Sequence, residues 1–589
     1  MFFLIVMLFL SLSSAPTYGL PSNKKSRPSD DLRMFAGRGG EAYELDSSKR
    51  AGRAGTFSSE YQPIINLTTN GWVFKDPLLM NQTSNETVDV AISKNPLGKE
   101  EYVVATLSRF WDGGNLYSII DFYLVNLSSA KIFLNHTNFS VTITFLGEYL
   151  ITGDTSDRGR IVAFDVLWFN SNIIELAYIK QYIKPFGTTT LDNFDIVKVN
   201  FTISPWQTLN ELSLDSYYGT GLDIKIFNWE DKNMPTVLWL VRKLENFSFV
   251  GGGIQTYKFN LVFWREDIGY YPVDLSNFEV YQADPKDGAL SNIIYDYYNN
   301  QVVAITAMES STLSSIAYVV FDGAISKQEE LLTSDELEIV LDFKDPTIVP
   351  TENMTAFLIT FIGYSEYESY LVYMYADYNP SGLSLSLRDY SVDLSLMRTH
   401  SPILIDNNNI NDTIAIAMWI DTSEEPVIKG MILNYTGYFN KSKIYTYVNL
   451  SDVIAFDAMM TLEHSIEIIF NSTYSETAQA NNSILLAHLS DIPGGRYPYI
   501  AFALCDEDKD YLGDVEEPYY SGDPSLNDTD SDMIVDGSEV FIYHTRVNDS
   551  DTDDDYLLDG EEIRGVNISS IGIIQTDPRE SDTDNDLSL

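Results

Sequence analysis

The sequence predicts an all-β protein whose largest part, residues 61–504, is a β-propeller of seven or eight blades. Three observations support this fold class. Short apolar runs rich in Val, Ile, Tyr and Phe alternate with polar loops, no segment keeps a 3.6-residue apolar period, and one strand–loop–strand hairpin recurs. Apolar residues make up 44% and aromatic residues 13% of the 589 residues, which is enough for a large packed core.

The recurring hairpin has an apolar first strand, a polar loop and a second strand in which apolar and polar residues alternate. Its eight copies, the third of them looser, start at Glu101, Glu148, Asp195, Thr236, Gln301, Thr355, Thr413 and Ile466. The starts lie 41 to 65 residues apart, close to the roughly 40–50 residues of a four-stranded propeller blade. Closing such units into a ring buries their faces and edges.

Tandem β-sandwich domains remain the alternative, because they share this strand texture. The ring is favoured because no linker-like change of composition interrupts residues 61–504. Within each blade, the nearly continuous apolar first strand of the hairpin ("VVAIT", "FLITF", "IAIAM") is predicted to be the innermost strand. The alternating second strand is predicted to lie further out.

The N-terminal residues indicate export. Residues 1–19 begin with an apolar run that is too short to span a bilayer, which needs ~20 residues, and that has the length of a signal peptide's core. Residues 20–60 are rich in Gly, Ser, Arg and Lys and are predicted to be a disordered linker. No later stretch is apolar enough for a transmembrane anchor.

Glycosylation signals and the cysteine content agree with an extracellular or cell-surface glycoprotein. Asn-x-Ser/Thr sequons are frequent and include Asn66, Asn81, Asn126, Asn200, Asn353, Asn434 and Asn471. Cys505 is the single cysteine, so an intramolecular disulfide cannot hold the fold, and a large core or a bound metal must do so.

Negative charge is concentrated at the C-terminus. The formal net charge is -48, and residues 506–589 contain 26 acidic and 4 basic residues, a balance of -22. Such a surface repels phosphate, which excludes nucleic acid as a partner. It favours cations.

Three twelve-residue frames divide this acidic segment: "DEDKDYLGDVEE", "DTDSDMIVDGSE" and "DTDDDYLLDGEE". The predicted ligands, at positions 1, 3, 5, 7, 9 and 12, are Asp506, Asp508, Asp510, Leu512, Asp514 and Glu517, then Asp528, Asp530, Asp532, Ile534, Asp536 and Glu539, then Asp551, Asp553, Asp555, Leu557, Asp559 and Glu562. Ca²⁺ takes six to eight oxygens. These oxygens come from alternate carboxylates in a tight loop, a backbone carbonyl at position 7, a water at position 9 and a bidentate Glu at position 12.

These frames resemble the calcium-binding repeats of the thrombospondin type 3 class, in the cysteine-free form of microbial secreted and surface proteins. The resemblance rests on "DTDDDYLLDGEE" and on "TDPRESDTDND", and it covers residues 505–589. Asp523 and Asp577, each followed by Pro, lie five residues before the next "DTD". It implies an acidic calcium-loaded rod or cap beside a larger domain, with ligands shared between neighbouring repeats. An acidic disordered tail is the alternative, although it leaves the Leu or Ile at 7 and the Glu at 12 unexplained.

Two features depart from that family pattern. Position 6, where the turn favours Gly, holds Tyr511, Met533 and Tyr556, at a cost of ~1 kcal/mol each. A fourth frame supplies Asp582, Asp584 and Asp586 and then ends without its closing Glu. We expect this fourth site to stay essentially empty at millimolar calcium.

No catalytic motif is present. The five histidines form no H-E-x-x-H, and neither G-x-S-x-G nor a P-loop occurs. The sequence therefore predicts an exported, calcium-binding, non-enzymatic protein whose propeller recognises surface glycans or other extracellular proteins. A secreted glycan-acting hydrolase with structural calcium and a structural surface-layer component are the alternatives.

Overall fold

A computed structural model describes most of the chain from residue 72 to residue 581. The described residues are 72–74, 78–80, 86–97, 101–112, 115–126, 142–152, 160–186, 189–248, 254–275, 285–310, 313–337, 342–351, 354–365, 368–406, 414–441, 444–446, 453–461, 483–492, 495–506, 508, 510–513, 517–568 and 572–581. The predicted signal peptide and linker, residues 1–60, lie outside them.

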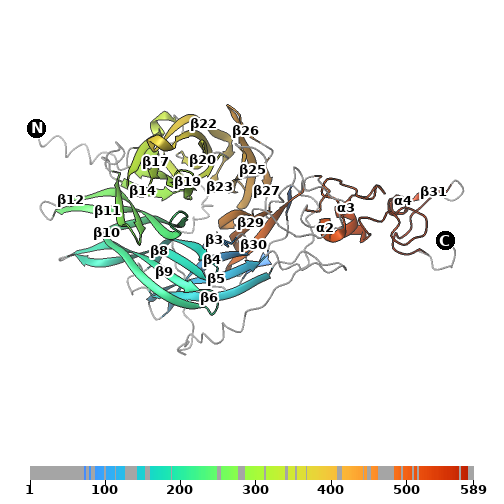
Figure 1. Ribbon diagram of the computed structural model, residues 1–589, viewed down its shortest axis with the longest axis horizontal. Coiled ribbons are helices and arrows are strands. Elements are labelled where there is room, and N and C mark those ends of the chain that lie inside the picture. Colours follow the sequence, from blue (N-terminus) through green and yellow to red (C-terminus); the bar gives the residue numbers. More distant parts are fainter. Residues whose placement is uncertain are drawn as a thin grey trace, which may run out of the picture. The chain divides into compact units, whose positions relative to one another are not determined.

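The strands between residues 72 and 505 form seven antiparallel blades, which confirms the propeller and fixes the blade number (Figure 1). Blade 1 holds β3 (Glu86–Lys94), β4 (Glu101–Asp112), β5 (Asn115–Asn126) and β6 (Thr142–Thr152). Blade 2 holds β7 (Arg160–Asn170), β8 (Ile173–Phe186), β9 (Thr189–Thr202) and the first half of β10 (Gln207–Trp229). Blade 3 holds the second half of β10, β11 (Met234–Ser248), β12 (Ile254–Arg265) and β13 (Gly269–Asp274).

The remaining blades follow the same order. Blade 4 holds β14 (Pro285–Leu290), β15 (Ile294–Asp296), β16 (Gln301–Ser310), β17 (Ser314–Phe321) and β18 (Ser326–Thr333), with η3 (Ser334–Glu336) after it. Blade 5 holds β19 (Asp342–Pro350), β20 (Ala356–Tyr364), β21 (Ser369–Asn379), η4 (Pro380–Gly382) and β22 (Ser384–Met397). Blade 6 holds β23 (Thr399–Asp406), β24 (Ile414–Asp421), β25 (Val427–Tyr435), β26 (Phe439–Lys441) and β27 (Tyr445–Thr446).

Blade 7 closes the ring, because both ends of the propeller chain contribute to it. It holds β28 (Val453–Thr461), β29 (Ser483–Ile492) and β30 (Gly495–Cys505), and the N-terminal strands β1 (Trp72–Phe74) and β2 (Leu78–Leu79) pair with β30. Trp72 lies opposite Cys505 in this pairing. A sheet edge that would otherwise be open is thereby covered.

One strand belongs to two blades. β10 pairs with β9 up to Tyr218 and with β11 from Gly219 onward. At this handover Gly219 has φ +141°, and a Cβ there would lie 2.1 Å from the carbonyl oxygen of Arg242. Glycine is therefore the residue that permits the close approach of the two backbones.

The apolar core lies between neighbouring blades. One cluster joins Phe122 and Val103 of blade 1 to Trp168 and Phe201 of blade 2, and corresponding clusters join blades 2 and 3, 3 and 4, 4 and 5, 5 and 6, and 7 and 1. Blades 1 to 5 are thus covered on both faces, which explains why their second strands are rich in apolar residues.

The recurring hairpin is confirmed in five places, but its place within the blade was predicted wrongly. The copies from Glu101, Thr236, Gln301, Thr355 and Thr413 are the second and third strands of blades 1, 3, 4, 5 and 6. The copy from Asp195 is β9 alone. The copy from Glu148 joins β6 of blade 1 to β7 of blade 2, and these strands belong to different sheets. The copy from Ile466 lies partly outside the described residues.

Short elements follow the propeller. They are α2 (Glu517–Tyr520), α3 (Asp536–Ser538), η5 (Glu539–Tyr543), α4 (Asp559–Arg564), β31 (Val566–Ile568) and β32 (Gly572–Ile574). Within the described part of the chain, no helix has both the length and the apolar character needed to cross a membrane.

Candidate metal loops and an axial channel

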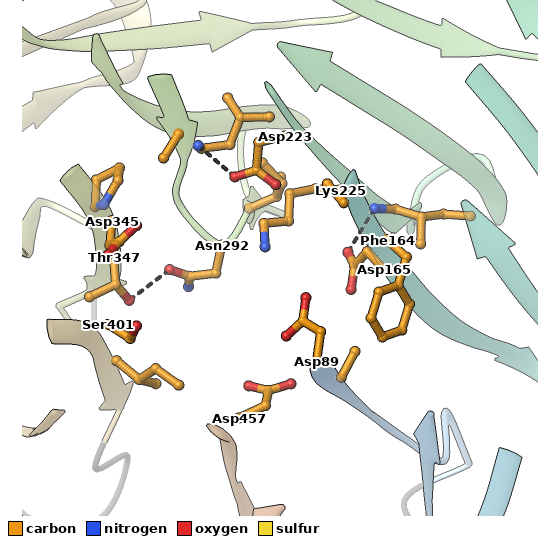
Figure 2. A pocket seen from close by; sticks show the side chains of 18 of the residues that line it. Asp89, Phe164, Asp165, Asp223, Lys225, Asn292, Asp345, Thr347, Ser401 and Asp457 are labelled. Carbon is orange, nitrogen blue, oxygen red and sulfur yellow. Dashed lines mark hydrogen bonds between the residues drawn. The ribbon is translucent and has the colours of Figure 1, made fainter. Parts of the chain in front are cut away.

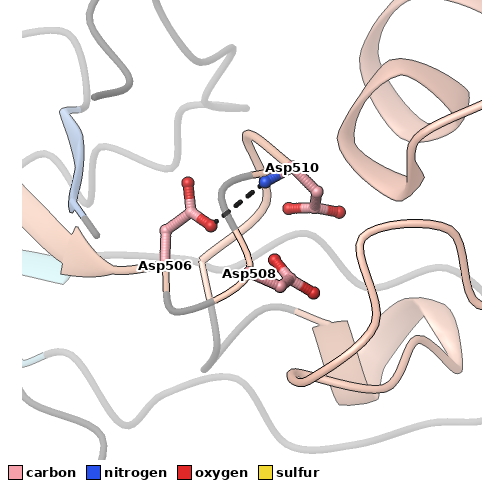
Figure 3. A group of neighbouring side chains, drawn as sticks. All are labelled: Asp506, Asp508 and Asp510. Carbon is pink, nitrogen blue, oxygen red and sulfur yellow. Dashed lines mark hydrogen bonds between the residues drawn. The ribbon is translucent and has the colours of Figure 1, made fainter. Parts of the chain in front are cut away.

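The three acidic frames fold as three similar loops, which we call loop 1 (506–517), loop 2 (528–539) and loop 3 (551–562). In each, the amide at position 5 donates a hydrogen bond to the carboxylate at position 1. The distances are 3.2 Å from Asp510 to Asp506, 3.2 Å from Asp532 to Asp528 and 3.0 Å from Asp555 to Asp551. Figure 3 shows the carboxylates of loop 1 around this turn.

The turn at position 6 has the conformation that the sequence predicted. Tyr511, Met533 and Tyr556 have φ of 83°, 81° and 77°, in the left-handed region that costs a non-glycine residue ~1 kcal/mol. At position 7 the side chains of Leu512 and Ile534 are buried. Burial of this side chain explains why an aliphatic residue stands there in an otherwise acidic loop.

Carboxylates crowd together inside each loop. Ligand oxygens of Asp506, Asp508 and Asp510 lie within 4.8 Å of one another, and so do those of Asp528, Asp530 and Asp532 and those of Asp551, Asp553 and Asp555. These groups can hold a metal ion, because carboxylates at this spacing repel one another unless a cation lies between them.

Several of these oxygens are buried without a hydrogen-bond donor among the described residues. They are Oδ2 of Asp530, both oxygens of Asp553 and Oε2 of Glu539. Burial and then the neighbouring Asp532 raise the pKa of Asp530 to about 7, and burial and then Asp530 raise the pKa of Glu539 to about 9. Buried acceptors without donors are costly, and a dication satisfies them.

The position-9 aspartates make contacts that the sequence analysis did not predict. Both oxygens of Asp536 accept hydrogen bonds from Thr529, from its amide at 2.7 Å and from its hydroxyl at 2.5 Å. Asp559 binds the amide of Thr552 at 2.8 Å and its hydroxyl at 2.7 Å. These aspartates fasten position 2 of their own loop, and their predicted role as ligands through water stays a prediction.

Each position-9 aspartate also lies beside the preceding loop. Asp536 forms a group with Asp510 and Glu517 of loop 1, and Asp559 forms a group with Asp532 and Glu539 of loop 2, all within 4.8 Å. The resemblance to repeats that share ligands implied such a contact. Asp514, Asp582, Asp584 and Asp586 lie outside the described residues, so their predicted roles stay predictions.

Asp-Gly steps pack one loop on the next. The amide of Gly537 donates to Asp510 at 3.0 Å, and that of Gly560 donates to Asp532 at 3.1 Å. A Cβ on these glycines would lie 2.4 Å from the carbonyl oxygen of Asp510 and 2.2 Å from that of Asp532. Glycine at position 10 therefore permits the loops to touch.

The pKa shifts predict how pH acts on the cation-free loops. A carboxylate whose pKa is raised by folding favours the folded state at low pH, and this contribution is lost as pH rises from its ordinary value to its folded value. For Asp530 and Glu539 that window runs from about 4 to about 9. In EGTA, hydrogen exchange at residues 528–562, corrected for its intrinsic pH dependence, should therefore show weaker protection at pH 8 than at pH 5.

Calcium should reverse this order, because an ion binds the deprotonated carboxylates and displaces their protons. Protection in excess calcium is expected to be stronger at pH 8 than at pH 5. Equal protection at both pH values in EGTA would contradict the raised pKa values.

The sequence analysis missed a second polar site, a channel on the propeller axis. A cavity of about 760 Å³ is lined by the innermost strands β3, β7, β10, β14, β19, β23 and β28. Six of these seven strands contribute an aspartate at the same place, which we call the aspartate ring: Asp89, Asp165, Asp223, Asp287, Asp345 and Asp457. The repeated apolar–Asp pattern, as in "AFDVLW" and "IAFDAM", was the available signal.

Members of the ring tie neighbouring blades together. Asp165 accepts the amides of Val166 in its own strand and of Ile226 in blade 3, each at 2.9 Å. Asp223 accepts those of Ile224 and Leu290 at 2.7 and 2.8 Å. Asp457 of blade 7 likewise accepts the amide of Ile92 in blade 1 at 2.7 Å.

Comparisons with known proteins do not identify a family. No family model matches the sequence, and no curated protein does. Solved structures that match include the α-L-arabinofuranosidase Arb93A of Fusarium graminearum (8% identity, TM-score 0.34, covering 64% of this chain and 98% of that one). The Nup133 β-propeller domain of Vanderwaltozyma polyspora matches at 11% identity and TM-score 0.33, covering 75% of this chain and all of that one.

A third match is a subtype N11 neuraminidase-like protein of a flat-faced bat influenza A virus, at 8% identity and TM-score 0.31, covering 76% of this chain and 98% of that one. These findings overturn the prediction that the protein is not an enzyme, since an arabinofuranosidase and a neuraminidase-like protein stand among its structural neighbours. The likeness is one of fold and gives this chain no particular activity.

Proposed function

We propose that this chain is an exported calcium-binding protein, in which the C-terminal loops take Ca²⁺ and the propeller binds an extracellular ligand or partner. The observation that carries the proposal is a set of buried carboxylate oxygens in loops 2 and 3, on Asp530, Asp553 and Glu539, to which no described residue donates a hydrogen bond. Hard oxygen donors at this density suit Ca²⁺, which accepts irregular geometry and six to eight ligands.

Mg²⁺ fits the loops less well. It requires near-octahedral geometry and keeps several waters, whereas these loops supply many carboxylates from a short stretch of chain. The extracellular location agrees with this choice, because calcium is near millimolar there and sites of modest affinity still fill. The apolar N-terminal run and the sequons support export.

Calorimetric titration of the full chain tests the proposal. We expect about three equivalents of Ca²⁺, one for each complete loop, and much weaker binding of Mg²⁺. Glu539→Gln removes a predicted bidentate ligand and should weaken one class of sites at least tenfold. Glu561→Gln is the matched control, because Glu561 is exposed at position 11 of loop 3.

Absence of calcium binding at 1 mM would contradict the proposal. So would an equal loss of affinity in both variants, which would indicate a diffuse response to negative charge. A clear fourth equivalent that Asp584→Ala removes would show that the incomplete fourth frame borrows ligands from a neighbouring loop.

A further inference from the structure

The axial channel carries an unbalanced negative charge. The aspartate ring contributes six carboxylates to its wall, against the ammonium groups of Lys225 and Lys344, an excess of four. Lys344 already forms ion pairs, since its Nζ lies 3.0 Å from Oδ2 of Asp287 and 3.7 Å from Oε2 of Glu309. A low-dielectric wall around a ring of like charges concentrates the field along the axis and attracts cations.

Lys225 shows that an ammonium group is held within this field. Its side chain extends from β10 into the channel (Figure 2). Within the described residues, its Nζ has no hydrogen bond and no ion pair within 4.0 Å. Burial lowers the pKa of Lys225, but Asp223, Asp165, Asp457 and Asp89 together outweigh burial and raise it. The ammonium is thus stabilised by several carboxylates at a distance.

One ring member, Asp89, makes no link between blades among the described residues. The amide of Trp168 in blade 2 donates to the hydroxyl of Ser93 at 2.8 Å, so Asp89 is not needed for that link. Its Oδ1 accepts the amide of Val90 at 2.9 Å, and no described residue donates to its Oδ2. Figure 2 shows the carboxylate of Asp89 pointing into the same space as Lys225.

On another part of the wall, beside Asp345, hydroxyl and amide groups also link neighbouring blades. The amide of Leu404 in blade 6 donates to the hydroxyl of Thr347 at 3.1 Å, and this hydroxyl is 3.0 Å from Oδ1 of Asn292. Asp345 also lines the channel and accepts a hydrogen bond from the backbone of Ser401 in blade 6. Burial raises the pKa of Asp345, and so does the charge of Asp223, while Lys344 and the hydrogen bond from Ser401 lower it.

The spacing of these groups favours an organic cation over a bare metal ion. All groups of three carboxylates whose oxygens converge within 4.8 Å lie in the C-terminal loops, as far as the described residues go. The channel carboxylates are spread around a cavity of about 760 Å³, a size typical of small-molecule sites. A ligand with several separated positive centres can meet several of them at once.

We propose that the axial channel binds a linear organic polyamine, whose ammonium groups are held by Asp89, Asp345 and Asp457 beside the fixed ammonium of Lys225. Such a ligand neutralises the excess charge that the protein leaves uncompensated. The site is separate from the metal loops and does not depend on calcium.

Calorimetric titration with spermine tests the proposal. The full chain is used at 1 mM calcium, so that any loop sites are filled in every sample. Spermine is expected to bind with a stoichiometry of one. Asp89→Asn should weaken this binding at least tenfold because it removes an attracting charge, whereas Lys225→Met should strengthen it at least tenfold because it removes a repelling one.

Asp335→Asn is the matched control, since Asp335 is an exposed aspartate in η3, outside the channel. It should leave spermine binding unchanged. Equal weakening by Asp335→Asn and Asp89→Asn would overturn the proposal in favour of a diffuse acidic surface.

The proposal would also be overturned if spermine did not bind, or if Lys225→Met weakened its binding. It would equally be overturned if Mg²⁺ bound and Asp89→Asn weakened that binding, while spermine did not bind. Circular dichroism establishes that each variant is folded. If Asp89→Asn does not fold, the opposite sign expected for Lys225→Met still decides the question. The two titrations test separate proposals. Calcium binding by the loops and spermine binding by the channel can each be found without the other.

Discussion

Replacing Asp165 by alanine is expected to lower the propeller's free energy of unfolding by about 4 kcal/mol. The carboxylate accepts the amides of Val166 and Ile226, and the side chains of both residues are buried between blades. Each amide left without its acceptor costs ~1–3 kcal/mol. Urea denaturation followed by circular dichroism measures the loss.

Asp89→Ala is the matched control for this prediction. Asp89 occupies the same place in blade 1 and binds a single amide, that of Val90, because Ser93 makes the link to blade 2. The loss should be only about 1 kcal/mol, because a single amide loses its acceptor. Equal losses in the two variants would show that the link between blades contributes little.

Replacing Gly560 by alanine is expected to uncouple loop 3 from loop 2. The new Cβ would lie 2.2 Å from the carbonyl oxygen of Asp532, a backbone atom that cannot rotate away. Overpacking of this kind costs ~1–3 kcal/mol, so calcium affinity should fall roughly thirtyfold if the loops fill together. Limited proteolysis across residues 540–560 at fixed calcium gives an independent measurement.

Glu561→Ala is the control, because Glu561 is the exposed next residue of α4. Gly537→Ala should behave like Gly560→Ala, since its Cβ would lie 2.4 Å from the carbonyl oxygen of Asp510. A Gly560→Ala protein with unchanged affinity and unchanged cleavage would mean that the loops bind independently.

The acidic clusters could be predicted from sequence because carboxylates at alternate positions of a tight loop come together. Alternate aspartates predicted a common centre, and the clusters at Asp528, Asp530 and Asp532 lie together as expected. The second role of position 9 was not readable. It arises from Thr529 and from the preceding loop, and such tertiary contacts leave no periodic signal in a single frame.

The propeller could be predicted from the apolar runs of its second and third strands. These strands are apolar because they lie between neighbouring blades. The innermost strands were not predicted, because they are not continuously apolar. They face a polar channel, so an aspartate interrupts the apolar run, and "PKDGAL" in β14 also contains Pro and Gly. The closing strand β1 is three residues long, too short for any pattern, and its pairing depends on a strand more than four hundred residues away.

That distance places a time constraint on the protein's biosynthesis. The ring cannot close until β30 exists, and 421 residues separate Phe74 from Gly495 (495 − 74). At ~5–20 residues per second, the ribosome takes on the order of 20–80 seconds to make them. Throughout this interval Ile92 and Tyr102 of blade 1 lack their apolar partners Leu489 and Ile500 of blade 7. Every nascent chain therefore presents an apolar face for many seconds, long enough for chaperones to act on it before the last blade arrives.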